Sequence, residues 1–204
     1  MFTGIVQHIG AVKQVQDLGD NSLRIEIDCK DLNASSQIGD SVSIDGVCLT
    51  VEKINDNSLS FTAIAETLSK TKMVSIKDGD LVNVEKSATF QDLVGGHPSS
   101  GHIDTTGIIL KISQSDSWSV LRIGFDNDFK NLIVSKGSIS LDGVSLTISD
   151  LQVEDKQPWF EVSLVPVTLS KTTLNSLQVG SKVNIEFDQV GKYIAQNLRM
   201  QNER

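Results

Sequence analysis

The chain of 204 residues is poor in cysteine and in aromatic residues, and both shortages narrow its class. It holds two cysteines, Cys29 and Cys48, which are too few for the disulfide framework of a small secreted domain. Aromatic residues make up only 5% of the chain, while Val, Ile, Leu, Ser and Thr carry much of the sequence. This balance favours small β-rich modules whose cores consist of branched aliphatic side chains.

Positive charge and long apolar runs are also scarce. The 18 lysines and arginines face 26 aspartates and glutamates, which gives a net charge of −8. A chain without a basic stripe is poorly suited to nucleic acid, and an anionic membrane would repel it. No apolar run approaches the length of a transmembrane helix. The first ten residues, MFTGIVQHIG, lack the basic and apolar regions of a signal peptide. We therefore expect a cytoplasmic protein with reduced thiols.

The usual catalytic signatures are missing as well. The sequence has no glycine-rich dinucleotide motif after a strand and no phosphate-binding loop. His97 and His102 lie five residues apart in a stretch rich in Gly, Pro and Ser, which is not the helical spacing of a metal-binding pair. We expect no metal site.

What the chain does contain is an internal repeat, the feature to seek first because missing it would misassign the fold. Residues 43–51 (SIDGVCLTV) and 140–148 (SLDGVSLTI) match at six of nine positions, at an offset of 97 residues. Later the offset is 101, as in the TLSKT shared by residues 67–71 and 168–172. An insertion of four residues near residues 154–159 accounts for the change. Matches in the same order with one insertion indicate a duplicated domain.

Each half, residues 1–90 and 91–188, has the pattern of short strands. Asp45-Gly46 and Asp142-Gly143 stand between apolar stretches, which is a strong hairpin signal. Closely spaced short strands favour a small closed barrel, because closure removes exposed strand edges. We therefore predict an all-β fold with two barrels in tandem.

The tail, residues 189–204, does not repeat. Val190, Ile194 and Leu198 are spaced four apart and flanked by Tyr193, so they form one face of a helix. A lone helix of this length is marginal in water and needs a partner surface. That surface could be the chain's own barrels or another copy of the chain, and we favour self-association.

Equivalent positions of the two halves carry different reactive side chains. Cys48 corresponds to Ser145, and His102 corresponds to Ile5. Cys48 could be a small buried hydrophobe beside a turn, and His102 could be an ordinary core or loop histidine. The alternative is that the two copies of one pocket have taken different chemical roles.

Hydroxyl groups recur at equivalent positions, including Thr50 and Thr147. They could be strand threonines on a polar face, or they could bind a polyol or the edge of a heterocycle. The residues alone therefore predict a duplicated β-barrel with two polar pockets, and no particular reaction.

Several of these segments resemble the riboflavin synthase family, in the right order and in both halves. The chain has MFTGIV, DGVCLTV and ETL in the first half, and GGHPSSGHID (residues 95–104), KGSISLDGVSLT and NIEFD in the second. The resemblance spans nearly the whole chain. It implies two tandem six-stranded Greek-key β-barrels and a C-terminal amphipathic helix that assembles a homotrimer.

The resemblance also implies a reaction that needs no cofactor. Two molecules of 6,7-dimethyl-8-ribityllumazine dismutate to riboflavin and 5-amino-6-(ribitylamino)uracil by transfer of a four-carbon unit. The family's active site lies between the N-terminal barrel of one subunit and the C-terminal barrel of its neighbour. Duplicated pockets suit this chemistry, because two copies of one molecule must face each other and be oriented. Association with lumazine synthase is a further expectation.

For this reaction we expect His102 to act as the base, since a histidine titrates near neutral pH. Cys48 and Ser145 are expected to assist proton transfer or transient addition. Thr147 and Asp188 are expected to polarise or position the substrate.

The residues expected to bind the substrate lie in matching segments of the two halves, and many would contact the pyrimidine edge through their backbone. They are Gly4, Ile5, Val6, Ser41, Cys48, Leu49, Thr50, Thr62, Ala63, Ile64, Ala65, Glu66, Thr67, Gly101, His102, Ile103, Lys136, Ser145, Leu146, Thr147, Ser163, Leu164, Val165, Pro166, Val167 and Thr168.

Two other functions fit a duplicated barrel. One is a non-catalytic lumazine- or flavin-binding protein of the same fold, and the other is a purely structural protein. Binding proteins of this kind lose catalytic side chains and often one pocket. This chain keeps candidate residues in both halves, which favours the enzyme.

Overall fold

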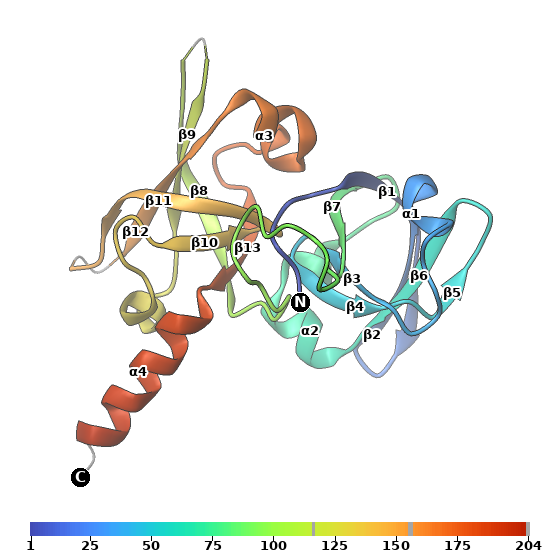
Figure 1. The fold of residues 1–204 in the computed structure, drawn as a ribbon, viewed down its shortest axis with the longest axis horizontal. Helices are drawn as coiled ribbons and strands as arrows, with labels where there is room; N and C mark the ends of the chain where they lie inside the picture. The colour runs from blue at the N-terminus through green and yellow to red at the C-terminus, as the bar shows by residue number, and fades with distance from the viewer. Residues whose placement is uncertain (116, 155–156, 203–204) are drawn as a thin grey trace.

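The computed structural model describes residues 1–115, 117–154 and 157–202, and it places two β-barrels side by side with a helix projecting from one of them (Figure 1). The helices of the described residues are too short or too polar to cross a membrane. The last two residues of the predicted tail helix lie outside the described residues.

The N-terminal half forms one strongly bent sheet of seven strands. In spatial order these are β4 (Val47–Thr50), β3 (Ser41–Ile44), β7 (Leu81–Lys86), β1 (His8–Gly19), β2 (Ser22–Asp28), β6 (Ser58–Ala63) and β5 (Lys53–Ile54). β5 follows β4 after two residues, so the two edges of the sheet are pieces of one interrupted strand. The backbone amide of Glu52, within that interruption, still donates to the carbonyl of Ser60 at 2.9 Å.

The C-terminal half repeats this arrangement as a closed six-stranded barrel. Its strands are β8 (Thr105–Gln114), β9 (Ser119–Gly124), β10 (Ser138–Leu141), β11 (Val144–Gln152), β12 (Trp159–Leu164) and β13 (Lys182–Phe187). They close in the order β10-β11-β12-β9-β8-β13, which departs from chain order as in a Greek key. The uninterrupted β11 takes the place of β4 and β5. The predicted all-β duplicated fold is therefore confirmed, with a break in one strand of the first barrel.

Short helices occupy matching places in the two halves. The first half has α1 (Lys30–Asn33), α2 (Ala65–Lys70) and the 3-10 helix η1 (Lys72–Ser75), and the second has η2 (Asn127–Leu132), α3 (Pro166–Lys171) and η3 (Thr173–Ser176). The last helix is α4 (Gln189–Asn202), the only one without a counterpart among the described residues.

Each barrel encloses its own apolar core. Ile25, Ile27 and Phe61 are fully buried in the first, as are Ile123 and Phe160 in the second. The second core also gathers phenylalanines, with the rings of Phe160 and Phe125 5.6 Å apart. Burial of branched aliphatic and aromatic side chains is the main stabilising contribution to barrels of this size.

The two predicted hairpin turns meet at the boundary between the barrels. Asp45, Gly46, Asp142 and Gly143 all have positive φ angles, between 44° and 83°, as a type I′ turn requires. A Cβ atom on Gly46 would lie 2.7 Å from the backbone nitrogen of Gly143, and the reverse distance is also 2.7 Å. Only glycine allows the two turns to pack back to back.

Asparagines exchange hydrogen bonds across this boundary. The side-chain amide of Asn83 donates to the carbonyl of Asp142 at 2.9 Å, and that of Asn184 donates to the carbonyl of Asp45 at 2.9 Å. In return, Asn83 Oδ1 accepts from the backbone of Thr173, at 2.8 Å. Both asparagines are buried, so these bonds satisfy groups that would otherwise be costly to bury.

One lysine breaks the symmetry of this boundary. Lys72 Nζ lies 3.1 Å from Asp45 and 2.6 Å from Asp142, whereas the equivalent position in the second half is Thr173. Burial alone would lower the pKa of Lys72, but the two carboxylates outweigh it and raise that pKa. Burial raises the pKa of Asp142 to about 6, although Lys72 opposes this shift. One cation therefore compensates two buried acids.

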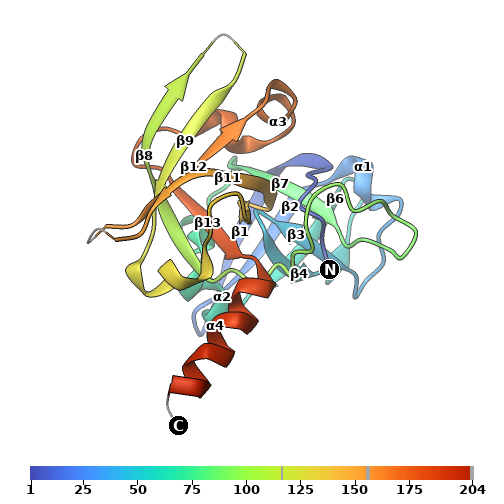
Figure 2. The same cartoon turned by 60° about the vertical axis from the view of Figure 1, so that its left-hand side comes forward.

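The first half of the C-terminal helix α4 contacts the second barrel, where Lys192 pairs with Asp104 at 2.7 Å and Ala195 is buried. Asp188 caps it by accepting from the backbone of Val190 at 2.9 Å, and Gly191 packs against the carbonyl of Leu132. The rest of α4 projects away from both barrels in both views (Figures 1 and 2). Ile194 and Leu198 are more than half exposed, so the predicted apolar face is present and uncovered within one chain.

Lys72→Met is expected to destabilise the fold by about 3–5 kcal/mol near neutral pH, because it leaves two buried carboxylates without a cation. Loss of Lys72 raises the folded-state pKa of Asp142 further. A raised folded pKa favours folding below the unfolded value and loses that favour as pH rises, so the deficit should shrink at about pH 5. Urea unfolding at about pH 7.5 and about pH 5 measures both quantities.

The matched control is Lys13→Met. Lys13 pairs with Asp28 at 3.9 Å on the surface, where both side chains are about 40% exposed. Its replacement should change the free energy of unfolding by less than about 1 kcal/mol. Equal effects of the two substitutions would contradict a special role for Lys72.

Candidate functional site

Two extended segments cross between the barrels. We call residues 2–6 the N-terminal strap and residues 99–103 the linker strap. Each leads into the first strand of its own barrel, β1 or β8. The straps pair with each other through Phe2 and Ser99, which exchange two backbone hydrogen bonds of 2.8 and 3.0 Å.

Each strap lies against the hairpin of the opposite barrel. The carbonyl of Gly4 accepts from the backbone amide of Ser145 at 2.8 Å, and the carbonyl of Gly101 accepts from that of Cys48 at 2.8 Å. Both glycines have positive φ, and a Cβ atom on either would lie within about 2.6 Å of the opposite residue's Cβ. The straps therefore bring residues of the two halves together at two equivalent places.

The first place lies on the N-terminal barrel, where Cys48 on β4 meets Gly101 of the linker strap; the other residues predicted for it lie at the end of β6 and the start of α2 of the same barrel. Cys48 is partly buried and Thr50 is exposed. Thr50 pairs with Ser41 across β3 and β4. The linker strap covers this side, with Ile103 packed on the N-terminal core and the His102 side chain exposed. We call this the N-terminal pocket; its predicted residues are Ser41, Cys48, Leu49, Thr50, Thr62, Ala63, Ile64, Ala65, Glu66, Thr67, Gly101, His102 and Ile103.

The second place, the C-terminal pocket, has the same construction on the other barrel. Ser145, Leu146 and Thr147 lie on β11, and β12 runs beside it with Val162 opposite Ile148. The N-terminal strap covers this side and packs Val6 on the C-terminal core. Its predicted residues are Gly4, Ile5, Val6, Ser145, Leu146, Thr147, Ser163, Leu164, Val165, Pro166, Val167 and Thr168.

Two predicted residues make other contacts. Lys136 Nζ donates to the carbonyl of Ser149 at 3.2 Å, on the turn before β10. Asp188 is occupied as the cap of α4. Within the part of the chain that the structure describes, the hydrogen bonds of these two side chains join them to backbone groups and to no candidate catalytic side chain.

A residue that the sequence reasoning missed is His97. Its spacing from His102 indicates no metal pair, yet its Nδ1 lies 2.6 Å from Ser145 Oγ and its side chain is buried. Burial lowers the pKa of His97, although Asp188 and Glu186 oppose the shift. The N-terminal pocket therefore has an exposed histidine on its strap, whereas the C-terminal pocket has a buried histidine bonded to its serine. Its position in the GGH stretch beside the linker strap was the available signal.

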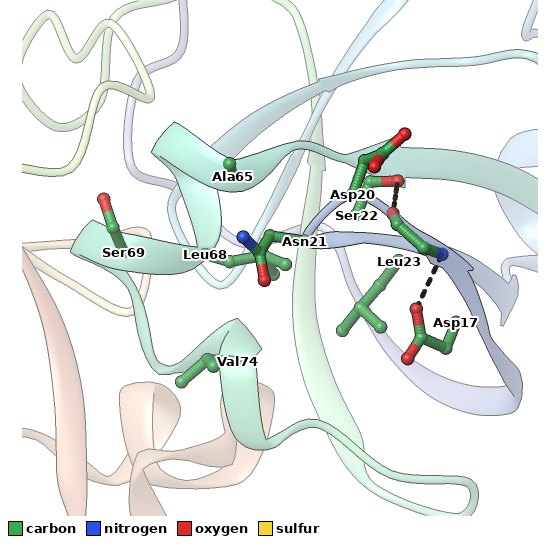
Figure 3. A pocket seen from close by; sticks show the side chains of 10 residues that line it. Asp17, Asp20, Asn21, Ser22, Leu23, Ala65, Leu68, Ser69 and Val74 are labelled. Carbon is green, nitrogen blue, oxygen red and sulfur yellow. Dashed lines mark hydrogen bonds between the residues drawn. The ribbon is translucent and has the colours of Figure 1, made fainter.

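A separate cavity lies between the β1–β2 turn and the helices α2 and η1 (Figure 3). It has a volume of about 640 Å³ and shares only Ala65 with the predicted site. Ala65, Leu68 and Ser69 lie on one face of α2, so Glu66 and Thr67 point elsewhere. At the predicted pockets, the side chains of Thr50, Thr147 and Val165 are exposed within a single chain.

Among the described residues, histidines, cysteines and acids form no group of three that could hold a metal ion.

The sequence matches the lumazine-binding domain family twice, over residues 3–87 and 100–188. The chain is 40% identical over 200 residues to riboflavin synthase of Mycobacterium tuberculosis, with 98% of each chain covered. It is 35% identical to the Bacillus subtilis enzyme of that name, covering all of this chain and 92% of the relative.

The chain belongs to the riboflavin synthase family. Its fold also matches solved structures of LumP. One, complexed with riboflavin, aligns with a TM-score of 0.84 at 26% identity, covering 92% of this chain and all of LumP. Another, complexed with 6,7-dimethyl-8-(1'-D-ribityl) lumazine, aligns with a TM-score of 0.81 at 27% identity, covering 91% and 98%. Family membership agrees with the two equivalent pockets described above.

His97 should make stability more sensitive to acid in this member of the riboflavin synthase family. A histidine with a lowered folded pKa contributes stability above its unfolded value, and that contribution is lost as pH falls through the folded pKa. His97→Gln, which can still bond to Ser145, should therefore lose less stability between about pH 7 and about pH 5. Urea unfolding at the two pH values compares the chains, and equal losses would contradict the assignment.

Proposed function

We propose that this protein catalyses the dismutation of two 6,7-dimethyl-8-ribityllumazine molecules to riboflavin and 5-amino-6-(ribitylamino)uracil, without a cofactor. The observation that carries the proposal is the pair of equivalent pockets, each built from one hairpin and the opposite strap. A reaction between two identical molecules needs two matching sites. Holding both molecules in place replaces a bimolecular encounter by an oriented pair.

The composition of the pockets supports this substrate. Each has an exposed threonine, Thr50 or Thr147, that can bond to the ribityl chain or to the ring edge. Each also has an exposed apolar residue at an equivalent position, Ile64 at 59% or Val165 at 51%, suited to a flat heterocycle. Backbone groups of the straps and of the segments after β6 and β12 complete the polar contacts.

In this proposal the two pockets have different chemical roles because their side chains differ. A proton leaves a methyl group of one lumazine, and the resulting carbanion attacks the ring of the other. His102 is the base, since its side chain is exposed beside the N-terminal pocket. Cys48 and Ser145, at the bases of the two pockets, assist proton transfer or addition, and Thr147 and Asp188 position the substrate.

The proposal extends to assembly. The uncovered apolar face of α4 supports a homotrimer, in which the N-terminal pocket of one copy faces the C-terminal pocket of the next. Such an arrangement would cover the pocket residues that are exposed in a single chain, such as Thr50 and Thr147. We assign residues 1–90 and 91–188 to the two lumazine-binding units and residues 189–204 to oligomerisation. A cytoplasmic location and association with lumazine synthase complete the proposal.

A non-catalytic binding protein is the alternative, given the likeness to LumP. The riboflavin synthases are more similar in sequence, at 35% and 40% identity against 26% and 27%. Cys48, His102, Ser145 and Thr147 are all present. These points favour the enzyme.

Incubation of the purified protein with 6,7-dimethyl-8-ribityllumazine alone should yield one riboflavin for every two lumazines consumed, together with the pyrimidine co-product. Chromatography with absorbance detection measures all three compounds. Tight binding without riboflavin would instead establish a carrier.

His102→Ala should lower the turnover number by about 100-fold or more, because general base catalysis contributes roughly that factor. His8→Ala, which changes a histidine on β1 outside both predicted pockets, is the control and should retain turnover. The initial rate of riboflavin formation at saturating lumazine compares them. Normal turnover of the His102 variant would remove it as the base.

A further inference from the structure

Two buried glutamates occupy equivalent positions in the last strands of the barrels. Glu85 lies on β7 and is 3% exposed, and Glu186 lies on β13 and is 1% exposed. Buried carboxylates are costly unless hydrogen bonds satisfy them. Neither glutamate has an ion-pair partner within 4 Å among the described residues, so the identity of their donors matters.

Among the described residues, the donors to the Glu85 carboxylate all belong to the N-terminal strap. Its Oε1 accepts from the backbone amide of Thr3 at 2.7 Å and from the Thr3 hydroxyl at 2.8 Å. Its Oε2 accepts from the backbone amide of Gly4 at 3.0 Å. Burial raises the pKa of Glu85, and the bonds from Thr3 oppose that shift. One side chain thus fixes the backbone of two consecutive strap residues.

Glu186 holds the linker strap in the same way. It accepts from the hydroxyls of Ser99 and Ser100 at 2.7 and 2.6 Å, and from the backbone amides of Ser100 and Gly101 at 2.8 and 2.9 Å. The Ser100 hydroxyl in turn accepts from the backbone amide of His102 at 3.2 Å. The chain direction at His102 therefore depends on Glu186.

Each glutamate is connected, through the strap that it holds, to the pocket of the opposite barrel. Glu85 belongs to the N-terminal barrel, yet the residue it holds, Gly4, bonds to Ser145 in the C-terminal pocket. Glu186 belongs to the C-terminal barrel, yet Gly101 bonds to Cys48 in the N-terminal pocket. Each glutamate thus reaches the pocket of the other barrel through a strap.

The geometry points to Glu85 and Glu186 as crossed positioning residues: Glu85 sets the wall of the C-terminal pocket, and Glu186 sets the wall of the N-terminal pocket together with His102. This inference rests on the proposed function for its kinetic consequences. The glutamates lie beneath the straps and act through them, so they are not catalytic residues.

The two straps carry different groups, and this predicts different kinetic effects. The linker strap carries the proposed base, so Glu186→Gln should lower kcat by about 10- to 100-fold, since small misplacement of a reacting group has effects of that size. The N-terminal strap carries Ile5 in the equivalent place and contributes only binding contacts. Glu85→Gln should therefore raise KM by about 10-fold and change kcat by less than about threefold.

The first experiment measures the straps without any ligand. In each glutamine variant, amide hydrogen exchange is followed residue by residue by NMR. Glutamine keeps the shape but turns one acceptor oxygen into a donor facing the glycine N–H. Exchange should rise by about 10-fold or more at Gly4 and Ser145 in Glu85→Gln, and at Gly101 and Cys48 in Glu186→Gln. Phe2 and Ser99 link the straps and should respond in both variants.

The second experiment titrates the variants with 6,7-dimethyl-8-ribityllumazine and follows the amides of Thr50 and Thr147. Glu85→Gln should weaken the response at Thr147, and Glu186→Gln the response at Thr50. Glu161→Gln is the matched control, because Glu161 pairs with Arg122 on the outside of the C-terminal barrel and touches neither strap. It should leave exchange at both straps unchanged.

Where a glutamine variant folds poorly, Thr3→Val or Ser100→Ala removes one strap hydroxyl from the same carboxylate and should act in the same direction. Effects confined to the glutamate's own barrel, or the same split of kcat and KM in both variants, would overturn the inference. If the parent chain makes no riboflavin but the exchange results are crossed, the proposed function fails while the positioning role stands.

Discussion

The rest of the structure depends on the hydrogen bonds that Asn83 and Asn184 make to the Asp–Gly turn of the opposite barrel. Asn83 and Asn184 each bond to their own barrel through the backbone and to the other barrel through the side chain. Because these groups are buried, a shift of one barrel against the other would leave several of them unsatisfied. The barrels are therefore held in one relative orientation, and only that orientation lets each strap reach the opposite hairpin.

Within this frame the two halves have diverged where function requires it. The backbone repeats closely, so Cys48 and Ser145, or His102 and Ile5, occupy matching positions with different chemistry. Even the boundary is asymmetric, since one lysine serves two acids. An asymmetric reaction between two identical molecules needs both properties, namely matched sites that orient the pair and unmatched side chains that distinguish donor from acceptor.

Two regions of the single chain expose residues that an assembly would cover, and one arrangement explains both. Residues of the predicted pockets such as Thr50 and Thr147 are exposed, and α4 projects from the barrels (Figure 2) with its apolar face exposed. Apolar faces of this kind usually mark an interface. Assembly through α4 would cover the helix and bring pockets of neighbouring chains together, whereas the strap contacts are complete within each chain.

The sequence by itself determined the duplication, the hairpin turns, the amphipathic tail and the family. These features depend on local residue patterns and on the spacing of repeated segments. It did not reveal that the leading segment of each half belongs to the opposite pocket, nor that Glu85, Glu186 and His97 support the straps and Ser145. Those contacts join residues up to 141 positions apart, as in the bond between Gly4 and Ser145. Only the packing of one barrel on the other decides which buried carboxylate meets which backbone amide, because that choice depends on orientation in space and leaves no periodic trace in the sequence.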